Sequence, residues 1–380
     1  MSDTTLICKK IERDNRIDTI RGLLLIFMAI DHFGGWITNY TWQFYGYSSD
    51  AEGFVFLSGF IFALVYGRHA SDLKGLTKKI FGRAFTVYKY HLSLVIFLPL
   101  LALLIPFYRY NWQNMLEYFF INGTPLKYIF SSSILLNQPT YMDVLPMYTV
   151  FILLSLPLIL LFKKGYASLA LIICGSVWII GQFINPISFL SDYFFHNSYP
   201  GLFNIFSWQL IFFVGAFLGF YKKIGKSIRV LSNRYVMILV CTLYVIILLS
   251  RYQFINLGFD INAATERSNL AWLRLVSFFS FAFVLSTILK TLPLSAKLPG
   301  IDFLGKHSLQ VFSFHIAVLY FIIVPLGAGI GIYEGYGKIA YLSVLVIFIL
   351  TLFIPAYIHS SIFVQLKKVK RNANERIACN

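Results

Sequence analysis

Long apolar runs recur along the whole chain and leave few architectures open to it. Apolar residues make up 58% of the sequence and charged residues only 13%. The runs are as long as, or close to, the roughly 20 residues that cross a bilayer as a helix. A bilayer interior admits only helices or closed barrels, and runs this continuous lack the alternation of a barrel strand. We therefore predict an all-α, polytopic bundle of about ten transmembrane helices. Its spans lie near Leu23, Val55, Leu94, Phe151, Leu171, Ile211, Leu239, Phe278, Val318 and Leu345.

Lysine and arginine set the expected orientation of these spans. They cluster before the first run, after the second, fourth, sixth and eighth runs, and at the C-terminus. Cytoplasmic loops carry such an excess of basic residues, so we expect both termini in the cytoplasm. The net charge of +16 is spread over short loops instead of forming one basic face, which argues for a lipid bilayer and against nucleic acid as a partner. The exceptions to the alternation are Arg109, Lys127, Arg251, Arg267, Arg274 and Lys338.

Three parts follow from these boundaries. The polar start lacks the apolar region and the cleavage site of a signal peptide, so residues 1–16 are expected to be a retained cytoplasmic tail. Residues 17–363 are expected to form the transmembrane domain, and residues 364–380 a basic cytoplasmic tail. Cys8 and Cys379 fall in the tails while Cys174 and Cys241 fall inside spans, so we expect neither a disulfide nor a metal site.

Ionisable residues inside the first span are the main functional signal. Arg21 and His32 lie eleven residues apart, about three helical turns, so both side chains share one helix face with roughly 16 Å between them. Such groups are costly in hydrocarbon and normally face a protein interior or an aqueous cavity. Asp31 is adjacent to His32 and lies about 100° away around the helix. We expect a functional site in the bundle, with His32 as its chemical centre.

The start of the second run, Ser49-Asp50-Ala51-Glu52, has two explanations. The S-x-x-E pattern is that of a capping box, in which Glu52 bonds the backbone at the start of the helix. Alternatively, Asp50 and Glu52 add two acids to the external end where His32 should emerge. Gly59, further along the run, indicates close packing against a neighbouring helix.

Polar positions in later runs each have a structural explanation beside a functional one. Lys89 in the third run can snorkel toward the cytoplasm, whereas His91 lies deeper. Asp143 and Gln209, at the starts of the fourth and sixth runs, could hydrogen-bond a polyhydroxylated molecule, although a helix cap would suit Asp143 equally. His315 lies roughly 12 to 15 Å into the ninth run. A lone histidine is often a satisfied structural residue, but a second intramembrane histidine makes a functional role an equal alternative.

The glycine-rich segment 327–337, GAGIGIYEGYG, superficially resembles a nucleotide-binding loop. It does not follow a strand within a βαβ unit, so we interpret it as a flexible external turn. The sequence also contains no H-E-x-x-H, Walker lysine loop or G-x-S-x-G elbow.

Several segments together resemble a known family. RIDTIRGLLLIFMAIDHF followed by SSDAEGFVFLSGFIFALVYG is similar to the OpgC family of membrane succinyltransferases, which modify osmoregulated periplasmic glucans. RAFTVYKYH, FNIFSWQLIFFVGAFLG and LGKHSLQVFSFHI are further similar stretches, so the resemblance covers nearly the whole chain. The family belongs to a wider group of integral-membrane acyltransferases that acylate cell-envelope polysaccharides. By this resemblance Arg21 and His32 match the essential pair, and the further matching positions are Asp31, Glu52, His91 and His315.

The resemblance implies an O-acyltransferase of the bacterial inner membrane. It would move a short acyl group, expected to be succinyl, from cytoplasmic acyl-CoA to hydroxyls of a periplasmic glucan or another envelope polysaccharide. Acyl-CoA, expected to be succinyl-CoA, is then a donor substrate, and no cofactor is permanently bound. His32 would be the general base, assisted by Asp31 or Glu52. The expected donor-binding residues are Arg21, Arg83, Lys89 and His91, and the expected acceptor-binding residues are Asp50, Asp143, Gln209 and His315.

Two other functions stay open. A polysaccharide O-acetyltransferase would use the same machinery. A proton-coupled transporter or flippase would also carry histidine, aspartate and arginine inside its spans, but no clear repeat relates residues 1–190 to residues 191–380. A purely structural scaffold does not explain His32 and Asp31.

Overall fold

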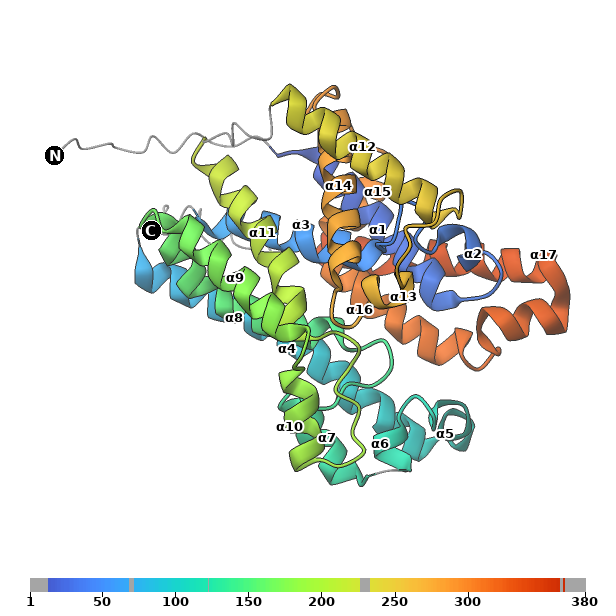
Figure 1. Cartoon of the computed structure of the whole chain (residues 1–380). Coiled ribbons are helices and arrows are strands. Elements are labelled where there is room, and N and C mark those ends of the chain that lie inside the picture. Colours follow the sequence, from blue (N-terminus) through green and yellow to red (C-terminus); the bar gives the residue numbers. More distant parts are fainter. Residues whose placement is uncertain (1–12, 68–71, 122, 226–232, 363–364, 366–380) are drawn as a thin grey trace, which may run out of the picture. The chain divides into compact units, whose positions relative to one another are not determined.

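The computed structural model describes residues 13–67, 72–121, 123–225, 233–362 and 365, and every regular element within these ranges is a helix (Figure 1). The predicted all-α class is confirmed for this part of the chain. Six of the described helices are long and apolar enough to cross a membrane, or up to seven if the bent pair Ala167–Gly181 and Pro186–Phe194 forms one span. A bundle with membrane-spanning helices is therefore supported, whereas the number ten and the orientation of the termini stay predictions.

The remaining predicted runs are also helical. The first forms a helix of 19 residues that carries several charged side chains, and the second forms one of 17 residues. The ninth forms the shorter apolar stretch Ser308–Ile323. Most of the two predicted tails, with Cys8 and Cys379, lies outside the described residues.

The chain divides into two compact units, each described here by itself. Of the described residues, the first comprises Arg13 and Gln43–Leu294, and the second joins Asp14–Trp42 to the residues from Ser295 onward. Both lie within the range 17–363 predicted as one transmembrane domain, apart from a few described residues at its two edges. The helices of the first unit are α3 (Asp50–Tyr66), α4 (Leu73–Leu104), α5 (Pro106–Trp112), α6 (Glu117–Phe120), α7 (Pro125–Ser133), α8 (Val144–Lys163), α9 (Ala167–Gly181), α10 (Pro186–Phe194), α11 (Ile205–Lys223), α12 (Arg234–Arg251), α13 (Ile261–Ala264) and α14 (Trp272–Leu289). Those of the second are α1 (Asn15–Phe33), α2 (Thr38–Thr41), α15 (Ile301–Lys306), α16 (Ser308–Val318), the π-helical segment η3 (Leu319–Ile323) and α17 (Ala328–Thr351).

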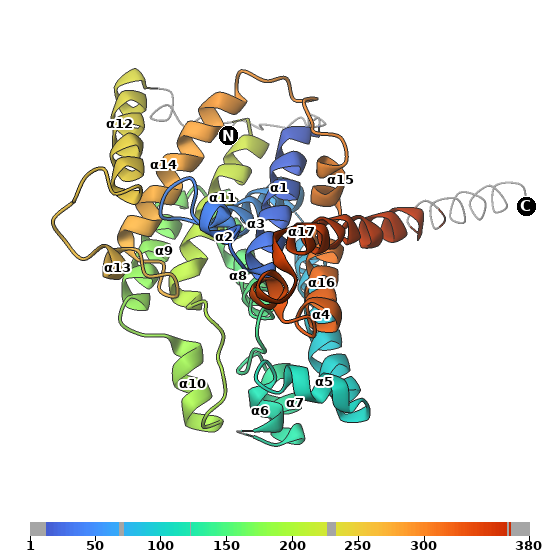
Figure 2. The same cartoon turned by 90° about the vertical axis from the view of Figure 1, so that its right-hand side faces the viewer.

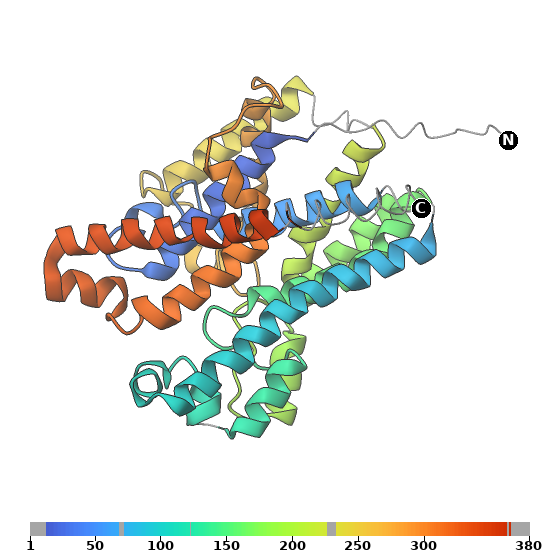
Figure 3. The ribbon, with the colours of Figure 1, turned by 180° about the vertical axis from the view of Figure 1, so that it is seen from behind.

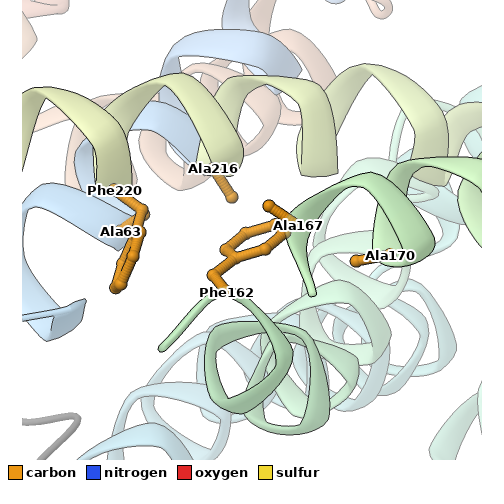
Figure 4. Packing of buried hydrophobic residues seen from close by; sticks show 6 residues of the cluster. All are labelled: Ala63, Phe162, Ala167, Ala170, Ala216 and Phe220. Carbon is orange, nitrogen blue, oxygen red and sulfur yellow. The ribbon is translucent and has the colours of Figure 1, made fainter. Parts of the chain in front are cut away.

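Small residues let α3 and α11 pack closely in the first unit. A Cβ on Gly59 would lie 1.9 Å from the carbonyl oxygen of Phe212, and one on Gly215 would lie 2.2 Å from that of Phe56. The prediction that Gly59 serves helix packing is thereby confirmed. Beside this contact, aromatic side chains of α8 and α11 pack on alanines of α3, α9 and α11 (Figure 4). The residues of this cluster are Ala63, Phe162, Ala167, Ala170, Ala216 and Phe220.

The Gly59→Ala variant is expected to lower the stability of the protein by about 1–3 kcal/mol or more, because the added methyl group meets backbone that cannot rotate away. Gly82→Ala on α4 is the matched control, since a Cβ there meets nothing within 4 Å. Alanine is the better helix former, so this control should keep or slightly raise stability. Thermal unfolding of both purified variants in one detergent measures the difference, and equal midpoints would contradict the predicted close approach.

Proline ends the long helix α4. Ile105 has extended φ and ψ angles, as residues before proline prefer, and Pro106 then begins α5. The short helices α5, α6 and α7 follow at this end of α4 (Figure 2). His91, in the middle of α4, reaches the C-terminal end of α7.

In the second unit, α1 packs against α15, α16 and α17. A Cβ on Gly22 would lie 1.9 Å from the carbonyl oxygen of Ile301, and one on Gly305 equally close to that of Asp18. Helix α17 bends sharply at Gly337, whose φ of 80° interrupts the helix (Figure 3). The prediction of a flexible turn over 327–337 was wrong, because the chain is helical from Ala328 and positive φ angles in this segment occur only at Gly327, Ala328 and Gly337.

Candidate active site

His32 lies in the last turn of α1, at a helix end that is fixed by several contacts. Gly34 follows as the C-cap with a φ of 77°, which glycine adopts easily, and its N–H donates to the carbonyl oxygen of Ile30 over 3.1 Å. The Tyr341 hydroxyl of α17 donates to the carbonyl oxygen of Gly34 over 2.7 Å. The imidazole is thus presented from a tethered helix end, where backbone carbonyls give a partial negative charge.

His32 and His315 face each other from α1 and α16. Nδ1 of His32 lies 3.0 Å from Nε2 of His315, and the ring centroids are 5.2 Å apart with 14° between the planes. His315 is 2% exposed, while His32 is half-buried. A hydrogen bond between two imidazoles needs one N–H and one lone pair, so the accepting ring must be neutral. Each ring can therefore fix the tautomer of the other.

Arg21 reaches the same partner helix at a different depth. Its Nη2 donates to the Oγ of Ser308 in the first turn of α16. Since Arg21 and His32 both contact α16, the prediction that they share one face of α1 agrees with the structure. The rise of α1 between them is about 16 Å, so this face carries a cationic group and an imidazole at well-separated levels.

The side chains of Asp31 and His32 contact different helices. Oδ1 of Asp31 accepts from the Thr41 hydroxyl over 3.0 Å, which links the end of α1 to α2. His32 instead contacts α16. The angular separation predicted between Asp31 and His32 is consistent with these different partners, and the assisting role of Asp31 stays a prediction.

Glu52 lies in the first unit, where both of its carboxylate oxygens are hydrogen-bonded. Oε2 accepts from the backbone N–H of Ser49 over 2.9 Å and from its hydroxyl over 2.8 Å, which confirms the capping box. Oε1 accepts from Nε of Arg274 on α14, and this ion pair is almost fully buried. These contacts give Glu52 a structural role in its own unit, and its catalytic role stays a prediction.

The remaining acceptor-binding candidates lie in the first unit at helix starts. Asp50 is in the first turn of α3 and 5% exposed. Asp143 occupies the N-cap position of α8, but its Oδ2 accepts from the N–H of Leu202 over 2.9 Å instead of capping the helix. Burial raises the pKa of the Asp143 carboxyl, against the opposing effects of the Leu202 N–H and the charge of Arg267. Gln209 donates to the carbonyl oxygen of Cys174 over 2.7 Å and so joins α11 to α9.

The donor-binding candidates of α4 differ in burial. Arg83 is half-buried and Lys89 is exposed, with Nζ of Lys89 5.1 Å from the ring centroid of Phe85. His91 is 0% exposed, and its Nε2 lies 3.1 Å from the carbonyl oxygen of Ser132. A carbonyl can only accept, so the proton of this imidazole is on Nε2. The snorkelling of Lys89 and the donor-binding roles stay predictions.

Sequence reasoning missed three residues that hold these groups in place. Arg274 stands inside an apolar run, so the argument that identified Arg21 could have found it. Ser308 follows His307 in the similar stretch LGKHSLQVFSFHI but has no pattern of its own. Thr41, the partner of Asp31, carries no sequence signal at all.

Comparison with known proteins adds one finding to this geometry. Residues 13–362 match the family model described as OpgC protein. No curated protein and no solved structure matches the chain. The matched range covers nearly the whole chain and includes both helices of the histidine pair. The chain therefore belongs to the OpgC protein family.

Proposed function

We propose that this protein is a membrane O-acyltransferase that moves a succinyl group from cytoplasmic succinyl-CoA to hydroxyls of a periplasmic glucan. The observation that carries the proposal is the hydrogen-bonded pair of His32 and His315 on α1 and α16 of an OpgC family member. Family membership supports a transferase role, and the paired imidazoles supply groups that can take up and release a proton. The acyl group, the acceptor and the inner membrane of a bacterium are parts of the proposal.

The donor end of the proposed site is at Arg21. A guanidinium binds phosphate oxygens in a bidentate manner, which suits the anionic nucleotide part of a CoA thioester. The pantetheine arm would then run along α1 toward His32, across the roughly 16 Å between the two side chains. Arg83, Lys89 and His91 are proposed as further donor contacts.

The chemical step needs a base at the acceptor hydroxyl. When Nδ1–H of His32 donates to His315, Nε2 of His32 carries the lone pair that takes the hydroxyl proton. The acceptor oxygen attacks the thioester carbonyl, the C–S bond breaks, and the imidazolium returns its proton to the CoA sulfur. No serine or cysteine of the first two runs is suitably placed as a nucleophile, so direct transfer is proposed. Asp31 and Glu52 are proposed to assist His32, and Asp50, Asp143, Gln209 and His315 to contact the acceptor.

Incubation of the purified protein with radiolabelled succinyl-CoA and soluble glucan tests the proposal. Transfer of label to the glucan with release of CoA is expected, and acetyl-CoA in parallel distinguishes an O-acetyltransferase. Mass spectrometry of envelope glycans from cells with and without the gene identifies the acyl group and its acceptor. A protein that consumes no thioester but moves protons or glycans across vesicles would instead be a transporter.

Arg21→Ala is expected to raise the Kd for acyl-CoA by roughly 10- to 100-fold, as loss of a hydrogen bond to a charged group does. Arg21→Lys should recover little of this, because an ammonium lacks the bidentate geometry. Ser308→Ala is the matched control, since it removes the hydroxyl that Arg21 contacts and keeps the guanidinium. Equilibrium binding of labelled acyl-CoA measures all three variants, and unchanged binding in Arg21→Ala would assign this arginine to helix anchoring.

Both termini are proposed to be cytoplasmic, with about ten spans in all. A reporter enzyme that is active only outside the cytoplasm, fused after Asn380, should therefore stay silent. The same reporter inserted after Tyr110, in the exposed helix α5, should be active. Activity at the C-terminus would reverse the proposed sides of donor and acceptor.

A further inference from the structure

The segment that follows His32 builds an aromatic surface that none of the proposed roles uses. We call Trp36, Tyr40 and Lys338 the aromatic shelf. The rings of Trp36 and Tyr40 meet edge to face with centroids 5.7 Å apart, and Nζ of Lys338 lies 4.7 Å from the Trp36 ring centroid. Tyr40 is 70% exposed, and Lys338 is also exposed. All three belong to the second compact unit.

Three contacts fix the shelf relative to His32. The Thr41 hydroxyl, next to Tyr40, donates to Asp31, which is adjacent to His32. The Tyr341 hydroxyl donates to Gly34, and its ring lies 6.1 Å from that of Trp36. A Cβ on Gly35 would lie 2.6 Å from the Tyr341 ring, so the backbone between His32 and Trp36 is packed directly on α17. The shelf therefore keeps one position beside the end of α1.

The chemistry of the shelf suits a sugar ring. A pyranose has an apolar face of C–H bonds that stacks on aromatic rings and a rim of hydroxyls that bonds to N–H groups and ammonium ions. Nε1 of Trp36 is a buried donor without a hydrogen-bond partner among the described residues, and such an unmet donor gains free energy when a ligand oxygen accepts from it. Lys338 adds three N–H donors at the same ring.

Tryptophan and tyrosine also occur as ordinary belts at membrane interfaces. A belt residue needs no fixed position relative to a catalytic group, no ammonium over its ring and no unmet donor inside the protein. The shelf has all three features, which favours a polyhydroxylated ligand over lipid headgroups.

We propose that the aromatic shelf of Trp36, Tyr40 and Lys338 binds a sugar unit of the acceptor chain and holds its neighbouring hydroxyl toward His32. This inference rests on the proposed function and names the acceptor subsite within it. The shelf follows α1 at the end opposite to Arg21, so donor and acceptor would approach His32 from different sides.

Calorimetric titration of the full-length protein in lipid nanodiscs with soluble β-glucan oligosaccharides tests the shelf. Trp36→Ala is expected to raise the Kd by about 30-fold, as truncation of a central aromatic contact does. Trp36→Phe keeps the stacking and loses the N–H, so its Kd should rise only roughly 2- to 10-fold. Tyr40→Ala should also weaken binding, and its exposure makes this variant safe for folding. Tyr235→Ala on α12, 77% exposed, is the matched control and should bind as the wild type does.

Kinetics separate this inference from the proposed function. The acceptor KM should rise in the shelf variants, while the donor KM and the thermal midpoint of Tyr40→Ala stay unchanged. If the shelf variants bind glucan more weakly but the wild type transfers no acyl group, the shelf is upheld and the proposed reaction is refuted. Acyl transfer with equal glucan binding in all variants would refute the shelf and leave the reaction intact. The fluorescence of Trp36 is the difference between the wild type and Trp36→Phe. If brominated lipid quenches this fluorescence and glucan does not change it, Trp36 belongs to a membrane belt and the inference is overturned.

Discussion

His32→Ala is expected to lower the rate of acyl transfer by about 10² to 10⁴, the range that a positioned general base contributes. Binding of acyl-CoA should persist, because the proposed donor contact, Arg21, lies about 16 Å away along α1. His315→Ala should lower kcat by a smaller factor and leave the donor KM unchanged, because the effect we propose for its hydrogen bond is to fix the tautomer and position of His32. The rates are measured with labelled acyl-CoA and saturating glucan.

His196→Ala is the matched control for this experiment, because it removes an exposed histidine of the first unit. It should transfer the acyl group at the wild-type rate. A His32→Ala variant that retains transfer within a few fold of this control would refute the base assignment. Label retained on a fragment containing His32, after incubation without acceptor, would refute direct transfer and make this histidine an acyl carrier.

Features set by residues of a single helix could be predicted from the sequence. The period of 3.6 residues assigned Arg21 and His32 to one face of α1, and both side chains reach α16. The S-x-x-E spacing predicted the bonds between Ser49 and Glu52. These patterns succeed because the interacting groups are within a few turns of each other and backbone geometry alone sets their positions.

Partners from distant helices could not be predicted in the same way. His32 and His315 were both identified, but 283 positions separate them and no local pattern says that they pair. Arg274 meets Glu52 across 222 positions, and no local pattern in the sequence pairs the two residues. Which helices become neighbours depends on packing over the whole unit, as in the close contact at Gly59, and one sequence does not give that arrangement.

The glycine-rich segment shows where a rule from soluble proteins misled the prediction. Clusters of glycine normally indicate turns in water. In an apolar environment each backbone group needs a partner, so a helix is favoured even through glycine, which is frequent in membrane helices. Segment 328–336 is accordingly helical, and the positive φ angles expected of a turn are confined to Gly327, Ala328 and Gly337.

Arg274→Ala is expected to destabilise the protein by about 3–5 kcal/mol, because it leaves the carboxylate of Glu52 buried without its cation. The side chains of Arg274 and Glu52 are 1% and 0% exposed, so water cannot replace the lost partner. Arg109→Ala is the matched control, since Arg109 is exposed and its guanidinium lies over the Phe120 ring at 5.5 Å. This contact contributes about 0.5–1 kcal/mol. Thermal unfolding in one detergent measures both variants, and equal midpoints would show that the buried pair contributes little.

The double variant Glu52→Gln with Arg274→Gln decides what Glu52 does. Two neutral amides keep hydrogen-bonding groups at both positions and remove both buried charges, so much of the lost stability should return. If Glu52 serves only the capping box and the ion pair, acyl transfer should return together with the thermal midpoint. If Glu52 instead assists His32 as a carboxylate, the double variant should unfold like the wild type and still transfer slowly, because an amide cannot take up a proton. The comparison of midpoint and kcat in one protein thus separates the structural role of Glu52 from the proposed catalytic one.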